Sequence, residues 1–195
     1  EELKKRGIHP EFVLDEGGAI VDGVFPGVSK SAALIGTAEK GTVSVDMTAS
    51  GKGGHASAPA SRQALGILGR ALSRIQDHAM PFTLTPPARE MFDILGRESS
   101  FGYKLLFANL WCFGPLLDLV CRKSGGELNA LVRTTCALTM AQGSKAFNVL
   151  PSTAHAGINL RLISADTIEA AIARLKTIVD DPSVEVKLVS CGEPS

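Results

Sequence analysis

The stretch Thr42-Val43-Ser44-Val45-Asp46-Met47-Thr48-Ala49-Ser50 decides the fold, because apolar and polar side chains alternate along it without a break. Successive side chains of a β-strand point to opposite faces of a sheet, so this alternation predicts a strand that is covered on one face only. Residues 134–140, 154–160 and 184–188 repeat the pattern. We therefore expect a sheet whose strands share one covered face and one open face.

Two helices with an apolar stripe are expected to cover that sheet. The first, at 59–75, carries apolar residues at helical spacing, and the second, at 166–179, starts with a capping box from Asp166 to Glu169. Along the chain the order is strand, helix, strand, strand, helix, strand. That order predicts an α+β, ferredoxin-like fold, in which a four-stranded antiparallel sheet has two helices on one face.

Residues 79–132 interrupt this order and hold seven of the ten aromatic residues in the chain. We expect them to form a helical insertion with a small core of its own. Packing alone would explain the composition of this insertion. A role in shaping an apolar part of a substrate pocket would explain it too, and the sequence leaves both possibilities open.

The first 30 residues differ in character from the rest. Residues 1–6 are expected to form a helix that ends at Gly7, and Phe12-Val13-Leu14 is a short apolar run typical of a buried parallel strand. The glycine-rich segment 17–29 is typical of a connector. We therefore place the domain boundary there and predict two units, 1–30 and 31–195.

Composition limits the partners of this chain. Its 195 residues include 20 Lys and Arg against 20 Asp and Glu, so it lacks the basic surface that nucleic acid or an anionic membrane requires. The apolar run 105–120 is interrupted by Gly114-Pro115 and is shorter than the roughly 20 residues of a membrane span. The four cysteines lack the spacing of a zinc knuckle or a disulfide framework, which favours a reducing, cytoplasmic location.

Glu16 and His55 are the first two candidates for chemistry. Glu16 follows the apolar run at 12–14, and a carboxylate at the carboxyl end of a parallel strand is well placed to bind zinc. A solvated acid in a turn would have the same sequence pattern. His55 lies in a glycine-rich loop directly after a strand, where the backbone could approach a ligand closely, although an isolated histidine in a loop is usually a surface residue.

Asn148 and Arg161 are candidates for binding a substrate. Asn148 comes shortly before Pro151, where its side-chain amide could contact a substrate carbonyl or carboxylate, or could close an Asx turn. The alternation in 154–160 places Arg161 on the open face of the sheet. A guanidinium there could bind a carboxylate through two parallel hydrogen bonds.

Three motifs together resemble one known family. Asp15-Glu16-Gly17-Gly18, Gly53-Gly54-His55-Ala56-Ser57 and Asn148-Val149-Leu150-Pro151 followed by Arg161 are similar to motifs of the di-zinc exopeptidase and aminoacylase family. That family includes aminoacylases, carboxypeptidase G, acetylornithine deacetylase and succinyl-diaminopimelate desuccinylase, and residues 12–18 resemble its Gly-X carboxypeptidase branch. The resemblance implies that residues 1–30 are a remnant of a catalytic domain and that residues 31–195 are its lid, or dimerisation, domain. The other zinc ligands and the general-base glutamate are expected outside both ends.

The resemblance also implies a role for three of the candidates. Glu16 would bind one of two zinc ions, and His55 would donate a hydrogen bond to the oxyanion, often in the neighbouring subunit of a homodimer. Arg161 would bind the free carboxylate of the substrate. Asn148 is a further candidate for substrate binding.

The implied parent enzyme is a zinc-dependent carboxypeptidase or N-acyl-amino-acid hydrolase, which cleaves an amide next to a free carboxylate in a small peptide or N-acyl amino acid. This chain alone is expected to be inactive and to bind no zinc tightly, because one carboxylate does not make a site that needs three or four ligands. The alternative is a non-catalytic ferredoxin-like binding or assembly module, since this fold hosts many unrelated roles. Glu16 argues against the alternative, because such a module has no use for a metal-binding carboxylate ahead of its sheet.

Overall fold

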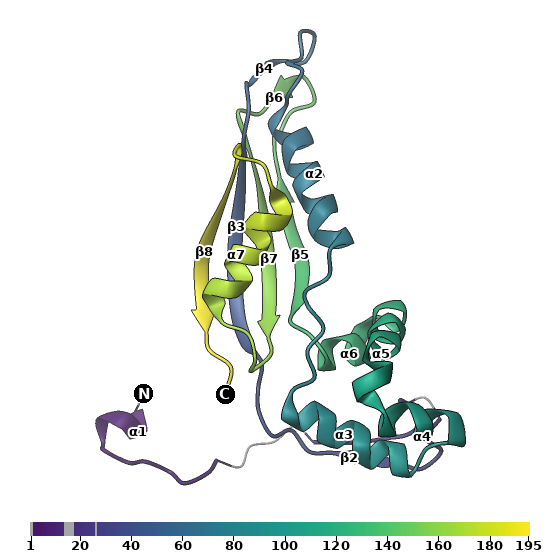
Figure 1. Cartoon of the computed structure of the whole chain (residues 1–195). Helices are drawn as coiled ribbons and strands as arrows, with labels where there is room; N and C mark the ends of the chain where they lie inside the picture. Colours follow the sequence, from purple (N-terminus) through teal and green to yellow (C-terminus); the bar gives the residue numbers. More distant parts are fainter. Residues whose placement is uncertain (1, 14–17, 26) are drawn as a thin grey trace.

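The computed structural model describes residues 2–13, 18–25 and 27–195. At its centre is a four-stranded antiparallel sheet in the order β5-β7-β3-β8, whose covered face carries two helices (Figure 1). This confirms the predicted ferredoxin-like α+β fold. The elements are β3 (Gly41–Ser50), α2 (Ala64–Asp77), β5 (Thr135–Gln142), β7 (Thr153–Leu162), α7 (Ile168–Val179) and β8 (Val184–Gly192).

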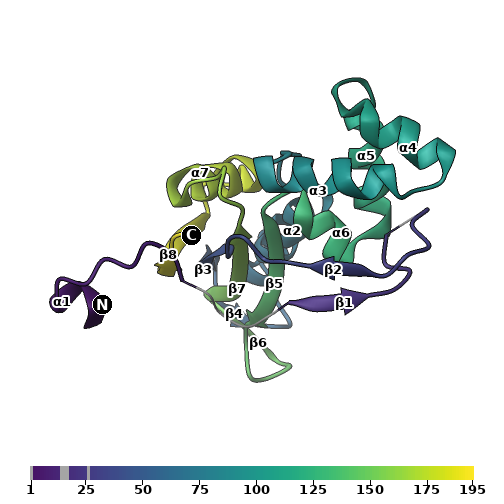
Figure 2. The same cartoon turned by 90° about the horizontal axis from the view of Figure 1, so that it is seen from below.

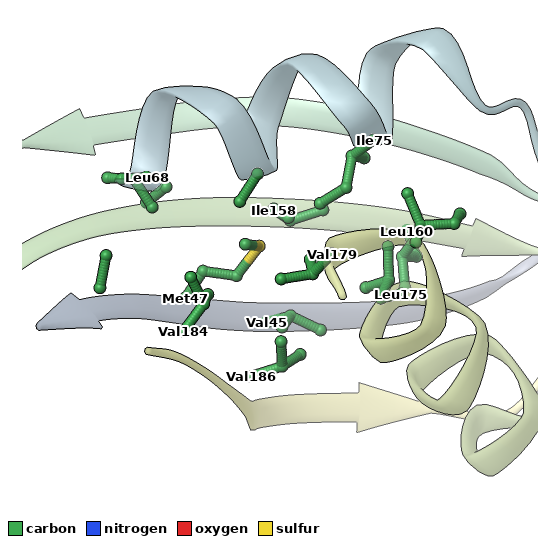
Figure 3. Packing of buried hydrophobic residues seen from close by; sticks show 14 of the residues in the cluster. Val45, Met47, Leu68, Ile75, Ile158, Leu160, Leu175, Val179, Val184 and Val186 are labelled. Atoms are coloured by element: carbon green, nitrogen blue, oxygen red, sulfur yellow. The ribbon is translucent and has the colours of Figure 1, made fainter. Parts of the chain in front are cut away.

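The core lies between the sheet and the two helices, and it follows the alternation of the sequence. In β3, Val43, Val45, Met47 and Ala49 are buried, while the residues between them are half-buried on the other face. β7 alternates in the same way. Figure 3 shows how these side chains meet Leu68 and Leu175 of the helices. Burial of this apolar surface is the main contribution that stabilises the fold.

The central pair of strands forms a continuous ladder. β3 and β7 pair without a register shift from Gly41 opposite Leu162 to Ser50 opposite Thr153. The outer strands are less regular, because β5 has a shift between Leu138 and Met140 and β8 pairs with a shift between Ser44 and Val45. Gly41 with Leu162 and Ser50 with Thr153 mark the two ends of the β3-β7 ladder, which are well separated.

Both covering helices begin later than the sequence pattern predicted. α2 begins at Ala64 and not at Pro59, which lies in the connection that follows β4. α7 is capped by Thr167, whose Oγ1 accepts a hydrogen bond from the backbone N–H of Ala170 at 3.2 Å. The predicted capping box at Asp166 is wrong, because the Asp166 carboxylate instead accepts a hydrogen bond from the hydroxyl of Thr134.

The insertion has a core of its own, as predicted. It consists of α3 (Pro86–Arg97), α4 (Phe101–Ala108), α5 (Leu110–Ser124) and α6 (Gly126–Leu131). The rings of Phe92 and Phe107 stack at its centre, with 5.3 Å between their centroids. Within the described part of the chain no single helix has the length and apolar composition of a membrane span, and only α4 and α5 taken together, with a 115° bend between them, meet that test.

A buried arginine joins the insertion to the sheet. Arg133, which is 1% exposed, donates hydrogen bonds to the Asp118 carboxylate, to Asn129 and to the backbone carbonyl of Met80. Burial by itself would raise the pKa of Asp118, but hydrogen bonds from Arg122 and Arg133 outweigh it and hold that pKa below its usual value. The charge of Arg133 is therefore compensated, as a buried charge must be.

The N-terminal region differs from the prediction at Phe12 and Val13. α1 (Glu2–Lys5) forms, but Phe12 and Val13 are exposed and lie outside any strand, so the predicted buried strand is wrong for these two residues. A parallel strand depends on hydrogen bonds to neighbouring strands, and no described strand pairs with them. Leu14 and Glu16 lie outside the described residues.

The segment predicted as a connector, 17–29, contributes the first strand of a hairpin that contacts the insertion. β1 (Ala19–Val21) pairs with β2 (Ala32–Leu34), and Figure 2 shows the two strands side by side. Between these strands Val28 forms a β-bridge with Ser99, and the ring of Tyr103 covers Gly27 so closely that a Cβ there would overlap it. The insertion therefore holds the segment that leads into the sheet domain.

Candidate functional site

Two loops meet at one end of the sheet, and we call residues 51–58 and 143–152 the tip. Within it β4 (Gly54–His55) pairs with β6 (Val149–Leu150), so that His55 lies opposite Val149. The backbone N–H of Ala56 also donates to the carbonyl of Asn148 at 3.0 Å. Figure 1 shows β4 and β6 together beyond the end of the sheet. His55 in β4 and Asn148 directly before β6, which are 93 positions apart in the sequence, are therefore held next to each other.

The glycines of the tip allow this close packing. A Cβ on Gly51 would lie 2.7 Å from the backbone nitrogen of Ala64, and one on Gly53 would lie 3.0 Å from the carbonyl oxygen of Leu150. Either substitution would force backbone atoms apart, because real Cβ atoms do not approach so closely. The glycine-rich motif around His55 therefore has a structural purpose, which is to hold the loop against its neighbours.

The hydrogen bonds of His55 determine which ring nitrogen carries its proton. Its Nδ1 accepts a hydrogen bond from the backbone N–H of Ser57 at 3.2 Å and lies 2.8 Å from the Ser57 hydroxyl. A nitrogen that accepts a hydrogen bond has no proton, so the neutral imidazole carries its proton on Nε2. Among the described residues none hydrogen-bonds to Nε2. The side chain is exposed, so it can donate that proton in a hydrogen bond to an oxyanion.

Asn148 also presents its side chain outward. Its carbonyl is used by Ala56, but its side-chain amide has no hydrogen-bond partner among the described residues. The Asx turn that was an alternative for this residue is therefore not formed within the described part of the chain. The exposed amide, with two donors and one acceptor, can bind a carbonyl or carboxylate group.

Arg161 lies on the open face of β7, as the alternation predicted. It is exposed, it sits between Thr42 of β3 and Thr135 of β5, and its Nη1 donates to the Thr42 hydroxyl at 2.8 Å. That contact fixes one arm of the guanidinium. The other N–H groups can pair with a carboxylate in the two-bond arrangement that arginine favours.

The structure does not bring Arg161 and the tip together. Ser50 and Thr153 lie at the end of the ladder next to the tip, whereas Arg161 and Thr42 lie near the other end. Thr153 and Arg161 are eight positions apart in the sequence, which is roughly 26 Å along a strand. The amide carbonyl and the carboxylate of an N-acyl amino acid are only a few bonds apart. One chain therefore cannot contact both groups of the same small substrate with His55 and Arg161.

Glu16 is not placed, because it lies outside the described residues. Elsewhere, in 2–13, 18–25 and 27–195, no three His, Cys, Asp or Glu side chains gather in a way that could hold a metal ion. The described residues therefore do not fit a metal by themselves, and we derive no chemical step through one.

A cavity of about 440 Å³ lies away from the tip, between α2, the insertion and the start of β5. It is lined in part by Met80, Arg133 and Cys136, and none of the predicted site residues lines it. Burial raises the pKa of Cys136 to about 11, so this thiol is protonated at neutral pH and is a poor nucleophile. The cavity offers no chemistry that competes with the tip.

One residue of the tip was missed by the sequence analysis. Phe147, directly before Asn148, is 108% exposed relative to a free reference residue. A large apolar side chain beside Asn148, in a loop that otherwise carries glycine, serine and lysine, was the signal that could have identified it.

Comparison with known proteins gives a consistent result. The family model described as "Peptidase dimerisation domain" of the M20 peptidases matches residues 37–187. The N-fatty-acyl-amino acid synthase/hydrolase PM20D1 of Xenopus tropicalis is 38% identical over 195 residues, which cover 100% of this chain and 38% of that protein. The probable carboxypeptidase S-like 2 of Dictyostelium discoideum is 37% identical over 181 residues, covering 92% of this chain and 34% of that protein.

A solved structure supports the fold alone. The di-peptidase Dug1p of Saccharomyces cerevisiae superposes with a TM-score of 0.50 at 12% identity, over 80% of this chain and 37% of that one. The chain thus spans well under half the length of the relatives that it matches. The family match covers three strands of the sheet and the start of β8, both covering helices and the insertion, and on that evidence the chain belongs to the dimerisation-domain family of the M20 peptidases.

Proposed function

We propose that this chain is the lid and dimerisation part of a larger zinc-dependent hydrolase that cleaves N-acyl amino acids into a carboxylic acid and an amino acid. The name of the Xenopus relative, which is 38% identical along the whole chain, supports this substrate class. Peptides with a free C-terminus present the same amide and carboxylate, so a carboxypeptidase is the second candidate, supported by the Dictyostelium relative. A free-standing binding module is not favoured, because both relatives carry the names of hydrolases.

The observation that carries the proposal is the position of the polar residues at opposite ends of one sheet. His55 and Asn148 lie at the tip, and Arg161 lies roughly 26 Å away along β7. If all three contact substrate, they must serve two different active sites. A homodimer provides two such sites, each with Arg161 from one subunit and the tip from the other.

The edge of the sheet at β5 is suited to form that dimer. β5 reads Thr-Cys-Ala-Leu-Thr-Met-Ala-Gln without a charged residue, and its residues 137–142 are exposed. The opposite edge, β8, carries Glu185 and Lys187. Charges on an edge strand discourage pairing with another chain. The uncharged edge is therefore the one that we assign to the interface between subunits.

When two β5 edges pair about a two-fold axis perpendicular to the sheet, so that the two sheets continue one another, the paired strands run antiparallel. The tip of one sheet then lies beside the far end of its partner, where the partner carries Arg161. This arrangement brings the two halves of the binding site together without any movement within either chain.

Each residue would have a separate task in that shared site. The Nε2–H of His55 would donate to the oxygen of the amide carbonyl, on which negative charge develops during hydrolysis. Arg161 of the other subunit would bind the free carboxylate, and Asn148 would orient the group between them. Zinc, with Glu16 as one ligand, is part of this proposal through the family alone.

The full-length parent enzyme should hydrolyse N-acyl amino acids, lose that activity when a chelator removes its metal, and regain it when zinc is added. The 195-residue chain alone should show no hydrolysis, because its described residues do not gather a metal site. Release of free amino acid, measured by chromatography, checks both statements. Metal-dependent hydrolysis by the isolated chain would contradict the assignment of this chain as a lid.

The proposed interface predicts the effect of a single charge on each edge. Ala137→Lys in β5 should convert the parent dimer into a monomer, because a charge on an edge strand discourages pairing and the dimer would carry one such charge from each subunit. Val189→Lys on the exposed part of β8 is the matched control and should leave the dimer intact. Light scattering after gel filtration measures the mass. If Val189→Lys gives a monomer and Ala137→Lys leaves a dimer, the interface between subunits is formed by β8 and not by β5.

A further inference from the structure

The connection between the β1-β2 hairpin and the sheet is too exposed to fix the angle between them. Residues 35–40 join β2 to β3 without forming a helix or strand, and the side chains at 35–39 are exposed. The hairpin pairs with no described strand of the sheet. Exposed segments with few packing contacts are the parts of a chain that bend and open most easily. If the sheet is to keep one orientation, a contact other than this connection has to hold it.

The insertion makes such a contact with the hairpin through the backbone. Val28 forms a β-bridge with Ser99, and the N–H of Ser100 donates to the carbonyl of Gly27 at 2.9 Å. This hydrogen bond flanks the bridge, so Val28 and Ser99 face each other as a non-hydrogen-bonded antiparallel pair. The hairpin turn and the start of α4 are therefore joined in a defined register.

Side chains add to this backbone contact. Phe25 and Val28, in the turn between β1 and β2, are buried together with Leu95 of α3. The ammonium group of Lys30 donates to the Glu98 carboxylate at 2.5 Å. An exposed ion pair contributes little by itself. Burial of the three apolar side chains is therefore what mainly stabilises the contact.

The insertion is also fixed on its other side, where it joins the sheet domain. The N–H of Thr83 donates to the carbonyl of Val132 at 2.8 Å, which ties the two ends of the insertion together. Next to them Arg133 donates to the carbonyl of Met80, and its own carbonyl accepts from the ammonium group of Lys40 at 2.9 Å. Lys40 directly precedes β3. Hairpin, insertion and sheet thus form a closed ring of contacts, and the connection cannot bend far unless one of these contacts breaks.

The distance from the connection to the tip makes this angle important. Figure 1 shows β2 and α3 at one end of the sheet and β4 with β6 at the other. The ends of β3, Gly41 and Ser50, are nine positions apart, which is roughly 30 Å. A rotation of about 10° at the connection would move a point at that distance by about 5 Å. A displacement of about 1 Å within an active site can already lower the rate about a hundredfold.

We propose that the insertion is a strap that holds the sheet domain at one angle to the hairpin, stays closed during turnover and thereby positions the tip in the partner's active site. β1 and Val28 lie within residues 1–30, for which the family resemblance implies the catalytic side of the parent enzyme. The strap would then join the lid to the catalytic domain at a second place. This inference rests on the proposed function, because the site that the tip reaches is the shared one.

A disulfide tests whether the strap stays closed. In the full-length enzyme, Val28→Cys combined with Ser99→Cys should form a disulfide, because the Cα atoms of a non-hydrogen-bonded pair are about 4.5 Å apart. The oxidised variant should keep kcat/KM for an N-acyl amino acid within about twofold of its reduced form. The control is the oxidised wild type, whose four cysteines are all free in the structure. Failure of the new cysteines to couple, or a loss of activity on oxidation that a reductant reverses, would overturn the proposal.

A charge in the buried contact tests whether the strap positions the tip. Val28→Asp should open the strap, because a carboxylate without a partner is costly to bury. We expect kcat to fall about ten- to a hundredfold and the amide hydrogens of residues 98–104 to exchange faster, because the N–H of Ser100 is released. Val24→Asp is the matched control, since Val24 lies in the same turn but is exposed, and it should change neither quantity.

A combination with His55→Ala separates positioning from a general loss of structure. In the His55→Ala background, Val28→Asp should lower kcat much less than it does in the wild type, because one of the groups that the strap positions is already missing. If the two losses multiply, or if Val28→Asp speeds exchange but leaves kcat unchanged, the insertion does not position the tip, and the proposed function stands. If the wild-type enzyme hydrolyses no N-acyl amino acid, the proposed function itself fails and this inference fails with it.

Discussion

Mixing two impaired versions of the full-length enzyme, one with His55→Ala and one with Arg161→Ala, should restore about a quarter of the wild-type activity. By itself, His55→Ala should lower kcat by about 10²–10³-fold, which is the usual effect of removing one oxyanion donor. Steady-state hydrolysis of an N-acyl amino acid, measured before and after the subunits exchange, gives both numbers.

The expected recovery follows from the positions of the two residues at opposite ends of the sheet. In a mixed dimer, the site that has Arg161 from the His55→Ala subunit receives an intact His55 from the other subunit. The second site lacks both residues. Random pairing makes half of the dimers mixed, each with one complete site of two, so about a quarter of the sites are complete.

A matched control uses two residues that lie at the same end. Asn148 is held beside His55 by the pairing of β4 with β6. In a mixture of His55→Ala with Asn148→Ala, every site of the mixed dimer lacks one of the two residues, so activity should not recover. Recovery of activity in this control would contradict the arrangement in which the tip acts in the partner's active site. So would a lack of recovery in the mixture of His55→Ala with Arg161→Ala, provided that exchange of subunits is confirmed.

Much of the fold could be predicted from the sequence, because the alternation of β3 and β7 has a direct structural cause. Buried positions such as Val45 and Ile158 must be apolar, and the open face of the same strands can be polar. The order of strands and helices then leaves few topologies. The insertion could be predicted as a separate helical core because its aromatic residues are concentrated in one segment.

The ends of the elements could not be predicted as well. Asp166 and Thr167 are both good N-cap residues. Thr134, which lies 32 positions before Asp166, donates a hydrogen bond to the Asp166 carboxylate, and Thr167 caps the helix instead. The β1-β2 hairpin was missed for a related reason. Its three-residue strands are supported by packing on the insertion around Phe25, Val28 and Leu95, which no local pattern shows.

The candidate residues could be predicted by type but not by position. An imidazole, a carboxamide and a guanidinium are suited to bind an oxyanion and a carboxylate. Their separation depends on the register of β3 with β7, which runs for the whole length of both strands. The roles of His55, Asn148 and Arg161 stay predictions. The register adds a constraint that the motifs alone do not contain, because it separates His55 and Asn148 from Arg161. In the proposed dimer these two groups would therefore belong to different active sites.

Arg161→Ala in the full-length enzyme should reduce the preference for substrates with a free carboxylate by roughly ten- to a hundredfold. A hydrogen bond to a charged group contributes about 1.5–3 kcal/mol, and each 1.36 kcal/mol corresponds to a factor of ten. The wild-type enzyme should therefore cleave an N-acyl amino acid faster than the matching amide, whose neutral end gives the guanidinium no charged partner. The ratio of the two kcat/KM values, measured for wild type and variant, isolates this contribution.

Two further variants separate the charge of Arg161 from its shape. Arg161→Lys keeps the positive charge but loses the paired N–H groups, so it should recover only part of the preference. Thr42→Val removes the hydroxyl that accepts from Nη1, and it should raise KM for the carboxylate substrate slightly, because one arm of the guanidinium is then no longer held. Equal losses on carboxylate and amide substrates in Arg161→Ala would remove this residue from the carboxylate role. The open face of β7 would then be a solvated surface, and among the described residues His55 and Asn148 would keep their roles in the proposed site.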